Sequence, residues 1–91
     1  MYYRINKWIK VDRGVYESDQ RTFCRIQMKH IGLYKISKDD RTNQWDVFKM
    51  DCNDERTVVD YIATFKTLKE AKLFAEDDFG IIFKLDDIDL A

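Results

Sequence analysis

The sequence predicts an α+β domain: an antiparallel meander of about four strands, one helix packed on one face, and a short C-terminal strand or extended segment. Stretches of alternating apolar residues are typical of half-buried strands. Thr67 and Glu70 have the spacing of a helix capping box, and an apolar stripe follows them at three- and four-residue steps. A sheet and a helix must each bury their apolar side, so we expect two packed layers.

The first third of the chain predicts two strands joined by a turn and a loop. Aromatic and branched residues indicate a strand over residues 2–11, and Asp12-Arg13-Gly14 is a turn signal. Residues 15–21 are polar and predict a loop. Residues 22–30 alternate and predict a strand with one wet face. Its two faces would carry Cys24, Ile26 and Met28 on one side and Arg25, Gln27 and Lys29 on the other.

The middle of the chain continues the meander. Gly32 marks a bulge or a bend, after which residues 33–36 continue as extended structure. The polar run 37–44 predicts a surface turn. Residues 45–50 form the next predicted strand, and residues 51–56 the hairpin loop that follows it.

The last third predicts one strand and the only helix. Val59, Tyr61, Ala63 and Phe65 alternate on one face of a strand that begins at Thr57. The helix is predicted over residues 67–79, with Gly80 as its C-terminal cap. The apolar residues 81–85 predict a short strand or an extended segment. Residues 86–91 are expected to fray or form a turn.

Size and composition favour a single domain over residues 1–91. No apolar run approaches the ~20 residues that span a bilayer, and residues 1–10 lack the apolar core of a signal peptide. Cys24 and Cys52 are 28 positions apart, and without a secretory signal we expect both to be reduced thiols. These features together predict a cytoplasmic protein.

Charge is distributed unevenly along the chain. Residues 1–49 carry eleven Lys and Arg against six Asp and Glu, while residues 50–91 carry five against eleven. The total of −1 therefore combines a basic first half with an acidic second half. Such asymmetry either steers a partner or is ordinary solvated surface, and both interpretations stay open.

Signatures of catalysis or metal binding are sparse, and we expect a protein that is not an enzyme and has no cofactor or metal. His30 is the only histidine, which excludes multi-histidine metal sites and relays. On one strand, Cys24 and His30 would lie roughly 20 Å apart. The acidic loop at residues 51–55 lacks the Gly and the bidentate Glu of an EF-hand.

Nucleic-acid binding is the alternative function. On the predicted strand 22–30 the outward residues Arg25, Gln27 and Lys29 would form a row on an open sheet face. Trp45-x-Val47 and the run 63–71 (ATFKTLKEA) also resemble the AP2-like modules of phage-type tyrosine recombinases, over residues 45–79. In that family a three-stranded sheet backed by one helix reads DNA, so the resemblance implies DNA binding. The chain departs from that pattern by placing acidic residues on the corresponding strands, namely Asp46, Asp51, Asp54, Glu55 and Asp60.

Our main functional hypothesis is a non-enzymatic module that binds a protein partner. The chain resembles small phage and mobile-element accessory proteins in size and charge, and the anti-CRISPR inhibitors of host defence nucleases belong to that group. The last sixteen residues carry a net charge of −5. An acidic partner-binding face is therefore predicted from Glu76, Asp77, Asp78, Asp86, Asp87 and Asp89. An edge strand left open by the meander would also allow a homodimer.

Overall fold

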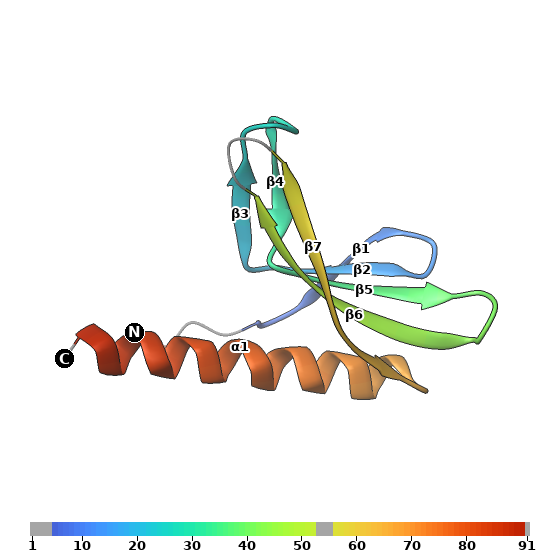
Figure 1. Ribbon diagram of the computed structural model, residues 1–91. Coiled ribbons are helices and arrows are strands. Elements are labelled where there is room, and N and C mark those ends of the chain that lie inside the picture. Colours follow the sequence, from blue (N-terminus) through green and yellow to red (C-terminus); the bar gives the residue numbers. More distant parts are fainter. Residues whose placement is uncertain (1–4, 53–55, 91) are drawn as a thin grey trace.

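A curved antiparallel sheet with a long helix along one face makes up the fold (Figure 1). The computed structural model describes residues 5–52 and 56–90, the last ten of them by their backbone. The elements follow in the order β1 (Trp8–Asp12), β2 (Val15–Ser18), β3 (Arg21–Cys24), β4 (Lys29–Gly32), β5 (Tyr34–Asp39), β6 (Gln44–Cys52), β7 (Thr57–Phe65) and α1 (Leu68–Leu90). The predicted α+β class, with a meander and one helix packed on it, is confirmed.

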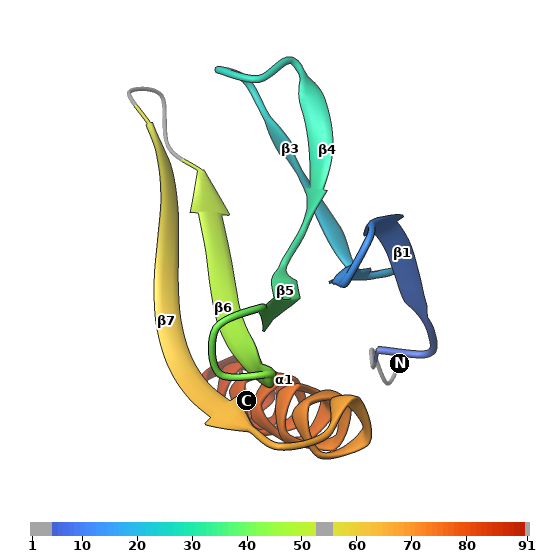
Figure 2. The same cartoon turned by 90° about the vertical axis from the view of Figure 1, so that its right-hand side faces the viewer.

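Five of the strands form one sheet in the order β1-β2-β5-β6-β7, and β3 pairs with β4 in a separate hairpin. Every pairing is antiparallel. The chain passes from β2 into β3 and returns from β4 into β5, so the two hairpins form one long bent ribbon. Its upper part, β3–β4, rises beside the ends of β6 and β7 (Figure 2).

The core lies between the sheet and the first three turns of α1. Ala71, Ala75 and Phe79 of the helix pack against Ile36 and Val47 of the sheet. All of them are buried, which confirms the apolar stripe predicted for the helix. The Thr67 hydroxyl accepts a hydrogen bond from the Glu70 amide at 3.2 Å, as an N-terminal cap does.

Two features explain the bend between β2–β5 and β3–β4. The buried Ser18 hydroxyl accepts from the Tyr34 amide at 3.1 Å and donates to the Gln20 carbonyl at 3.0 Å. Gly32 lies so close to β2 that an added Cβ would be 2.8 Å from the Cβ of Glu17. The bend predicted at Gly32 therefore depends on a close approach of two backbones.

The strand predicted over residues 22–30 is wrong. β3 ends at Cys24 and the chain turns back through residues 25–28 into β4. Met28 takes the left-handed conformation at φ 54° that such turns usually give to Gly or Asn. The predicted loop at residues 15–21 is also wrong, because Val15–Ser18 forms β2.

The predicted end of the helix is wrong as well. α1 continues through Gly80 to Leu90, so residues 81–85 are neither a strand nor an extended segment. A helical Gly costs about 1 kcal/mol relative to Ala, which is too little to end a helix on its own. No proline follows to stop the helix. The first strand was predicted over residues 2–11, and the observed strand β1 begins at Trp8. The part of the prediction that falls in residues 2–4 lies outside the described residues.

Candidate binding surfaces

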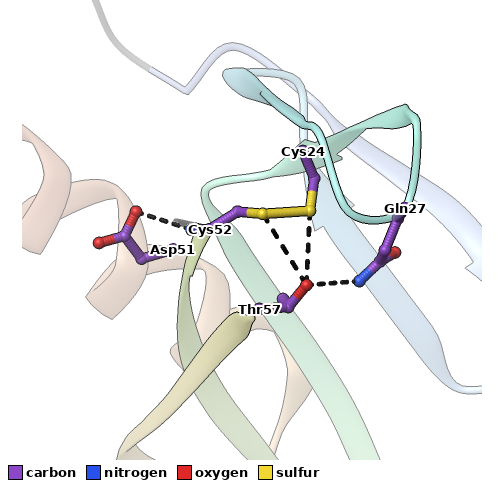
Figure 3. Close-up of a disulfide and its surroundings, with 5 residues drawn as sticks. All are labelled: Cys24, Gln27, Asp51, Cys52 and Thr57. Carbon is purple, nitrogen blue, oxygen red and sulfur yellow. Dashed lines mark hydrogen bonds between the residues drawn. A yellow bond between two sulfur atoms is a disulfide. The ribbon is translucent and has the colours of Figure 1, made fainter. Parts of the chain in front are cut away.

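A disulfide joins the β3–β4 hairpin to the end of β6, next to the connection between β6 and β7. Cys24 at the end of β3 bonds to Cys52 at the end of β6, with their Cα atoms 5.5 Å apart (Figure 3). The Thr57 hydroxyl lies 3.4 Å from the Cys24 sulfur and accepts a hydrogen bond from the side-chain amide of Gln27 at 2.8 Å. These contacts fix the β3–β4 hairpin to the start of β7.

The expectation of two reduced thiols is therefore wrong. Residues 28 positions apart meet because the β3–β4 ribbon bends back beside β6. Cys24 was predicted in the strand over residues 22–30 and Cys52 in the loop over residues 51–56, and nothing in the sequence placed the two close together. Their Cα separation lies within the range that disulfides require.

The row of Arg25, Gln27 and Lys29 does not form on an open sheet face. Arg25 and Gln27 lie in the β3–β4 turn, and Lys29 begins β4. The Gln27 side chain is directed to Thr57 (Figure 3). The turn region also exposes apolar side chains, namely Phe23, Ile26 and Met28, and the Phe23 ring contacts His30 with centroids 5.1 Å apart.

Three of the six acidic residues predicted as one face, Glu76, Asp77 and Asp78, have described side chains, and their environments differ. The Glu76 carboxylate accepts a hydrogen bond from the Trp8 indole at 3.2 Å. Asp78 accepts one from the hydroxyl of the buried Tyr34 at 2.5 Å. Burial, followed by this hydrogen bond and the Asp78 charge, raises the pKa of Tyr34 well above its ordinary value. Glu76 and Asp78 are therefore directed to the sheet, whereas Asp77 is exposed to solvent.

Asp86, Asp87 and Asp89 lie in the last turns of α1, whose C-terminal half extends beyond the strands of the sheet (Figure 1). The last turn contains no basic residue. Helix dipoles favour cations at this end and anions at the other. The acidic residues therefore stand at the end of the helix where the backbone dipole opposes negative charge.

The outer face of β6 and β7, turned away from α1, carries a group of apolar residues. Val47 packs toward the helix, so its neighbour Phe48 faces the other way. Phe48 pairs with Tyr61, and Met50 pairs with Val59. Val59 is 48% exposed and Tyr61 59% exposed. We call these four residues the β7 patch.

Side-chain contacts hold the aromatic rings of the β7 patch in place. The rings of Phe48 and Tyr61 meet edge to face with their centroids 5.9 Å apart. The Tyr61 hydroxyl is hydrogen-bonded to Thr64, whose own hydroxyl lies 2.6 Å from an Asp46 oxygen. Tyr61 thus presents a fixed ring to solvent.

A hollow of about 550 Å³ lies at the opposite end of the sheet, near the turns that join β1 to β2 and β5 to β6. Gly14, at φ 69°, accepts a hydrogen bond from the Lys38 amide at 2.8 Å, which holds the first turn against β5. The Lys38 ammonium lies 5.8 Å from the centre of the Trp45 ring. The residues that line the hollow are Lys10, Arg13, Gly14, Tyr16, Lys38, Asp40 and Trp45.

In the part of the chain that the structure describes, no three His, Cys, Asp or Glu side chains gather as the ligands of a metal would. No helix there has both the length and the apolar composition needed to cross a bilayer. Comparisons with protein-family models, with curated proteins and with solved structures gave no match.

Sequence reasoning missed both the β7 patch and the hollow. The signal for the patch was present, because Val59 and Tyr61 alternate in the predicted strand. We assigned them to the buried side, whereas a register shift beside Val47 and Phe48 turns them outward. The hollow gathers residues from four strands and two turns, and only the strand order brings those together.

Proposed function

We propose that this protein is a non-enzymatic module that binds a protein partner, and that an extended segment of the partner pairs with β7. The observation that carries the proposal is the β7 patch, in which Val59 and Tyr61 lie on the edge strand itself. Exposed aromatic and aliphatic side chains of this kind are typical anchors of protein interfaces.

The position of β7 supports pairing with a strand. Among the described strands, β7 pairs with β6 alone, so its other edge faces no neighbour in the sheet. It is nine residues long and contains no proline. A long edge strand offers backbone donors and acceptors to an added strand, while alternate side chains supply specificity. Val59 and Tyr61 would contact apolar residues at alternate positions of the partner segment.

DNA binding by the outer sheet face is less well supported. Glu17 and Asp46 lie on that face, and Lys35 pairs with Glu17. A sheet that contacts phosphates needs a basic surface. Of the residues predicted from the sequence to bind nucleic acid, Arg25 and Gln27 lie in the β3–β4 turn and Lys29 begins β4.

The absence of catalysis is part of the same proposal, and two observations support it. Cys24 and Cys52 are bonded to each other, so neither offers a thiolate nucleophile. His30 contacts the Phe23 ring at the exposed side of the β3–β4 hairpin. None of these three residues lines the hollow described above.

Photo-crosslinking in the native host tests the proposal. A photoreactive phenylalanine analogue is placed at position 61, and a matched control at position 73, where Leu73 is 55% exposed on α1. We expect one covalent adduct with another protein from position 61 and none from position 73. Equal adducts from both positions, or an adduct with a second copy of this chain only, would contradict the proposal. Tyr61→Lys should remove capture of the same partner, while Leu73→Lys should leave it unchanged.

The acidic end of α1 is a second candidate surface for a protein partner. Negative charge gathers there at the C-terminal end of a helix, where the backbone dipole disfavours it. A basic partner would neutralise the carboxylates and would also interact favourably with the dipole. Inhibition of a host nuclease is the specific form of this hypothesis. Replacing Asp86, Asp87 and Asp89 by Lys should then weaken capture of a basic partner. If the triple variant and Leu73→Lys both bind that partner as the unmodified protein does, the acidic end takes no part.

A further inference from the structure

The hollow beside the β1–β2 and β5–β6 turns gathers more positive than negative charge. Lys10, Arg13 and Lys38 line it, against the single carboxylate of Asp40. No ion pair joins these three cations to a carboxylate of the described residues. The three side chains come from β1, a turn and β5, so only the folded chain brings them together.

Aromatic rings position the ammonium groups around this hollow. The Lys38 ammonium lies over the Trp45 ring, and Lys72 of α1 lies over the Tyr16 ring at 5.0 Å from its centre. The two rings contact each other with centroids 6.1 Å apart. Cation–π contacts of this kind restrict a flexible lysine without neutralising its charge.

The same contacts limit the chemistry of a ligand. Faces of Trp45 and Tyr16 already carry ammonium groups, so a planar base has less ring surface on which to stack. A group with more than one negative charge suits three cations better than a single carboxylate does. The guanidinium of Arg13 forms a fork that matches phosphate oxygens, and lysines bind phosphate as point charges.

We infer that this hollow binds the phosphate groups of a phosphorylated small molecule. Its volume of about 550 Å³ lies within the range of small-molecule sites. An extended nucleic-acid backbone fits less well, because the exposed residue Asp40 lies among the cations and the exposed residue Asp12 directly precedes Arg13 in the chain. The inference concerns a different surface from the β7 patch and does not depend on the proposed function.

Calorimetric titration of the full chain with pyrophosphate at low ionic strength tests the inference. We expect saturable binding at one site. Arg13→Gln and Lys38→Gln should each weaken it by at least about tenfold, as loss of a charge-assisted hydrogen bond does. Lys29→Gln is the matched control, because Lys29 is an exposed lysine of the β3–β4 hairpin, and it should bind as the unmodified protein does. Thermal unfolding of each variant shows that the fold is intact.

Two further titrations, with ATP and with duplex DNA, separate the sources of the phosphate. ATP binding more tightly than pyrophosphate at the same site identifies a nucleotide, and equal affinities identify the phosphate groups alone; both support the inference. Duplex DNA binding more tightly than pyrophosphate, with loss in Arg13→Gln and Lys38→Gln, would overturn it in favour of nucleic acid. Absence of saturation with pyrophosphate and ATP, or an equal loss in Lys29→Gln, would overturn it as well.

Discussion

Gly32 and Gly80 occupy opposite kinds of environment. A Cβ at Gly32 would meet the Cβ of Glu17 at 2.8 Å and the backbone of Ser18 at 3.1 Å. A Cβ at Gly80 would have no atom within 4 Å. Gly32 is thus required by the close approach at the bend, while Gly80 only lowers the stability of a helix.

Alanine at these two positions should change stability in opposite directions. Gly32→Ala must displace backbone or a rigid Cβ, and we expect a loss of about 1–3 kcal/mol. Gly80→Ala should add about 0.5–1 kcal/mol, because alanine favours the helix. Urea denaturation measures both. A stabilised Gly32→Ala variant would mean that β2 and β4 do not approach each other as described.

Tyr34 links alkaline stability to the core. Burial, its hydrogen bond to Asp78 and the charge of Asp78 all raise its pKa in the folded protein. The neutral phenol therefore stabilises the fold below the unfolded pKa of about 10, and that contribution is lost as the pH rises further. Tyr34→Phe should reduce the loss of stability above pH ~10.

Absorbance of the phenolate band during alkaline titration measures this directly. The unmodified protein, with five tyrosines, should show one ionisation that is delayed until unfolding. The Tyr34→Phe variant should lack that late step. If the variant keeps it, the delayed group is not Tyr34 and the contact with Asp78 is not the cause.

At the scale of elements, the β3–β4 hairpin depends on contacts distant in sequence. Its turn contains none of Gly, Asn, Asp or Pro, and it places Met28 in the left-handed region. The Cys24–Cys52 disulfide and the Gln27–Thr57 hydrogen bond hold it to the β6–β7 end (Figure 3). These bonds supply what the local sequence lacks.

Replacing Cys24 and Cys52 together by Ser should cost about 2–4 kcal/mol of stability, the usual effect of removing a disulfide. Urea denaturation measures the loss, and the unmodified protein under reducing conditions should behave in the same way. Rapid alkylation of both cysteines in native protein without a reductant would contradict the pairing.

The elements also show what a sequence can and cannot predict. The cap at Thr67 and the stripe of Ala71 and Ala75 depend on neighbours along the chain, and these predictions were confirmed. The strand over residues 22–30 failed because its alternation runs unbroken through the turn. The helix end failed because Gly80 marks a cap only when the following residues leave the helix. The disulfide and the hollow arise from strand order, which residue patterns do not specify.

At the scale of the whole molecule, opposite charges gather at different ends. The β1–β2 and β5–β6 turns, which border the hollow, lie toward the start of α1 (Figure 1). Asp86, Asp87 and Asp89 belong to the last turns at its other end. Lys72 stands near the N-terminus of the helix, where the dipole also disfavours a cation. The near-neutral total charge of −1 hides this separation.

This arrangement predicts a gain in stability when the acidic end is reversed. Replacing Asp86, Asp87 or Asp89 by Lys should in each case stabilise the free protein by about 0.3–1 kcal/mol, because cations suit the C-terminal end of a helix. Circular dichroism should show equal or greater helix content. Asp77→Lys, in the middle of the helix, is the matched control and should change it little. Lower helicity in the triple variant would mean that the last turns depend on their carboxylates.

The proposed function depends on a partner strand that pairs with β7. Amide hydrogen exchange of the free protein and of its complex with the crosslinked partner measures this most directly. Exchange of Thr57–Phe65 should slow by at least about tenfold in the complex, while that of Trp8–Asp12 on the opposite edge should stay unchanged. Protection confined to β1 or to α1, with β7 exchanging as in the free protein, would contradict the claim.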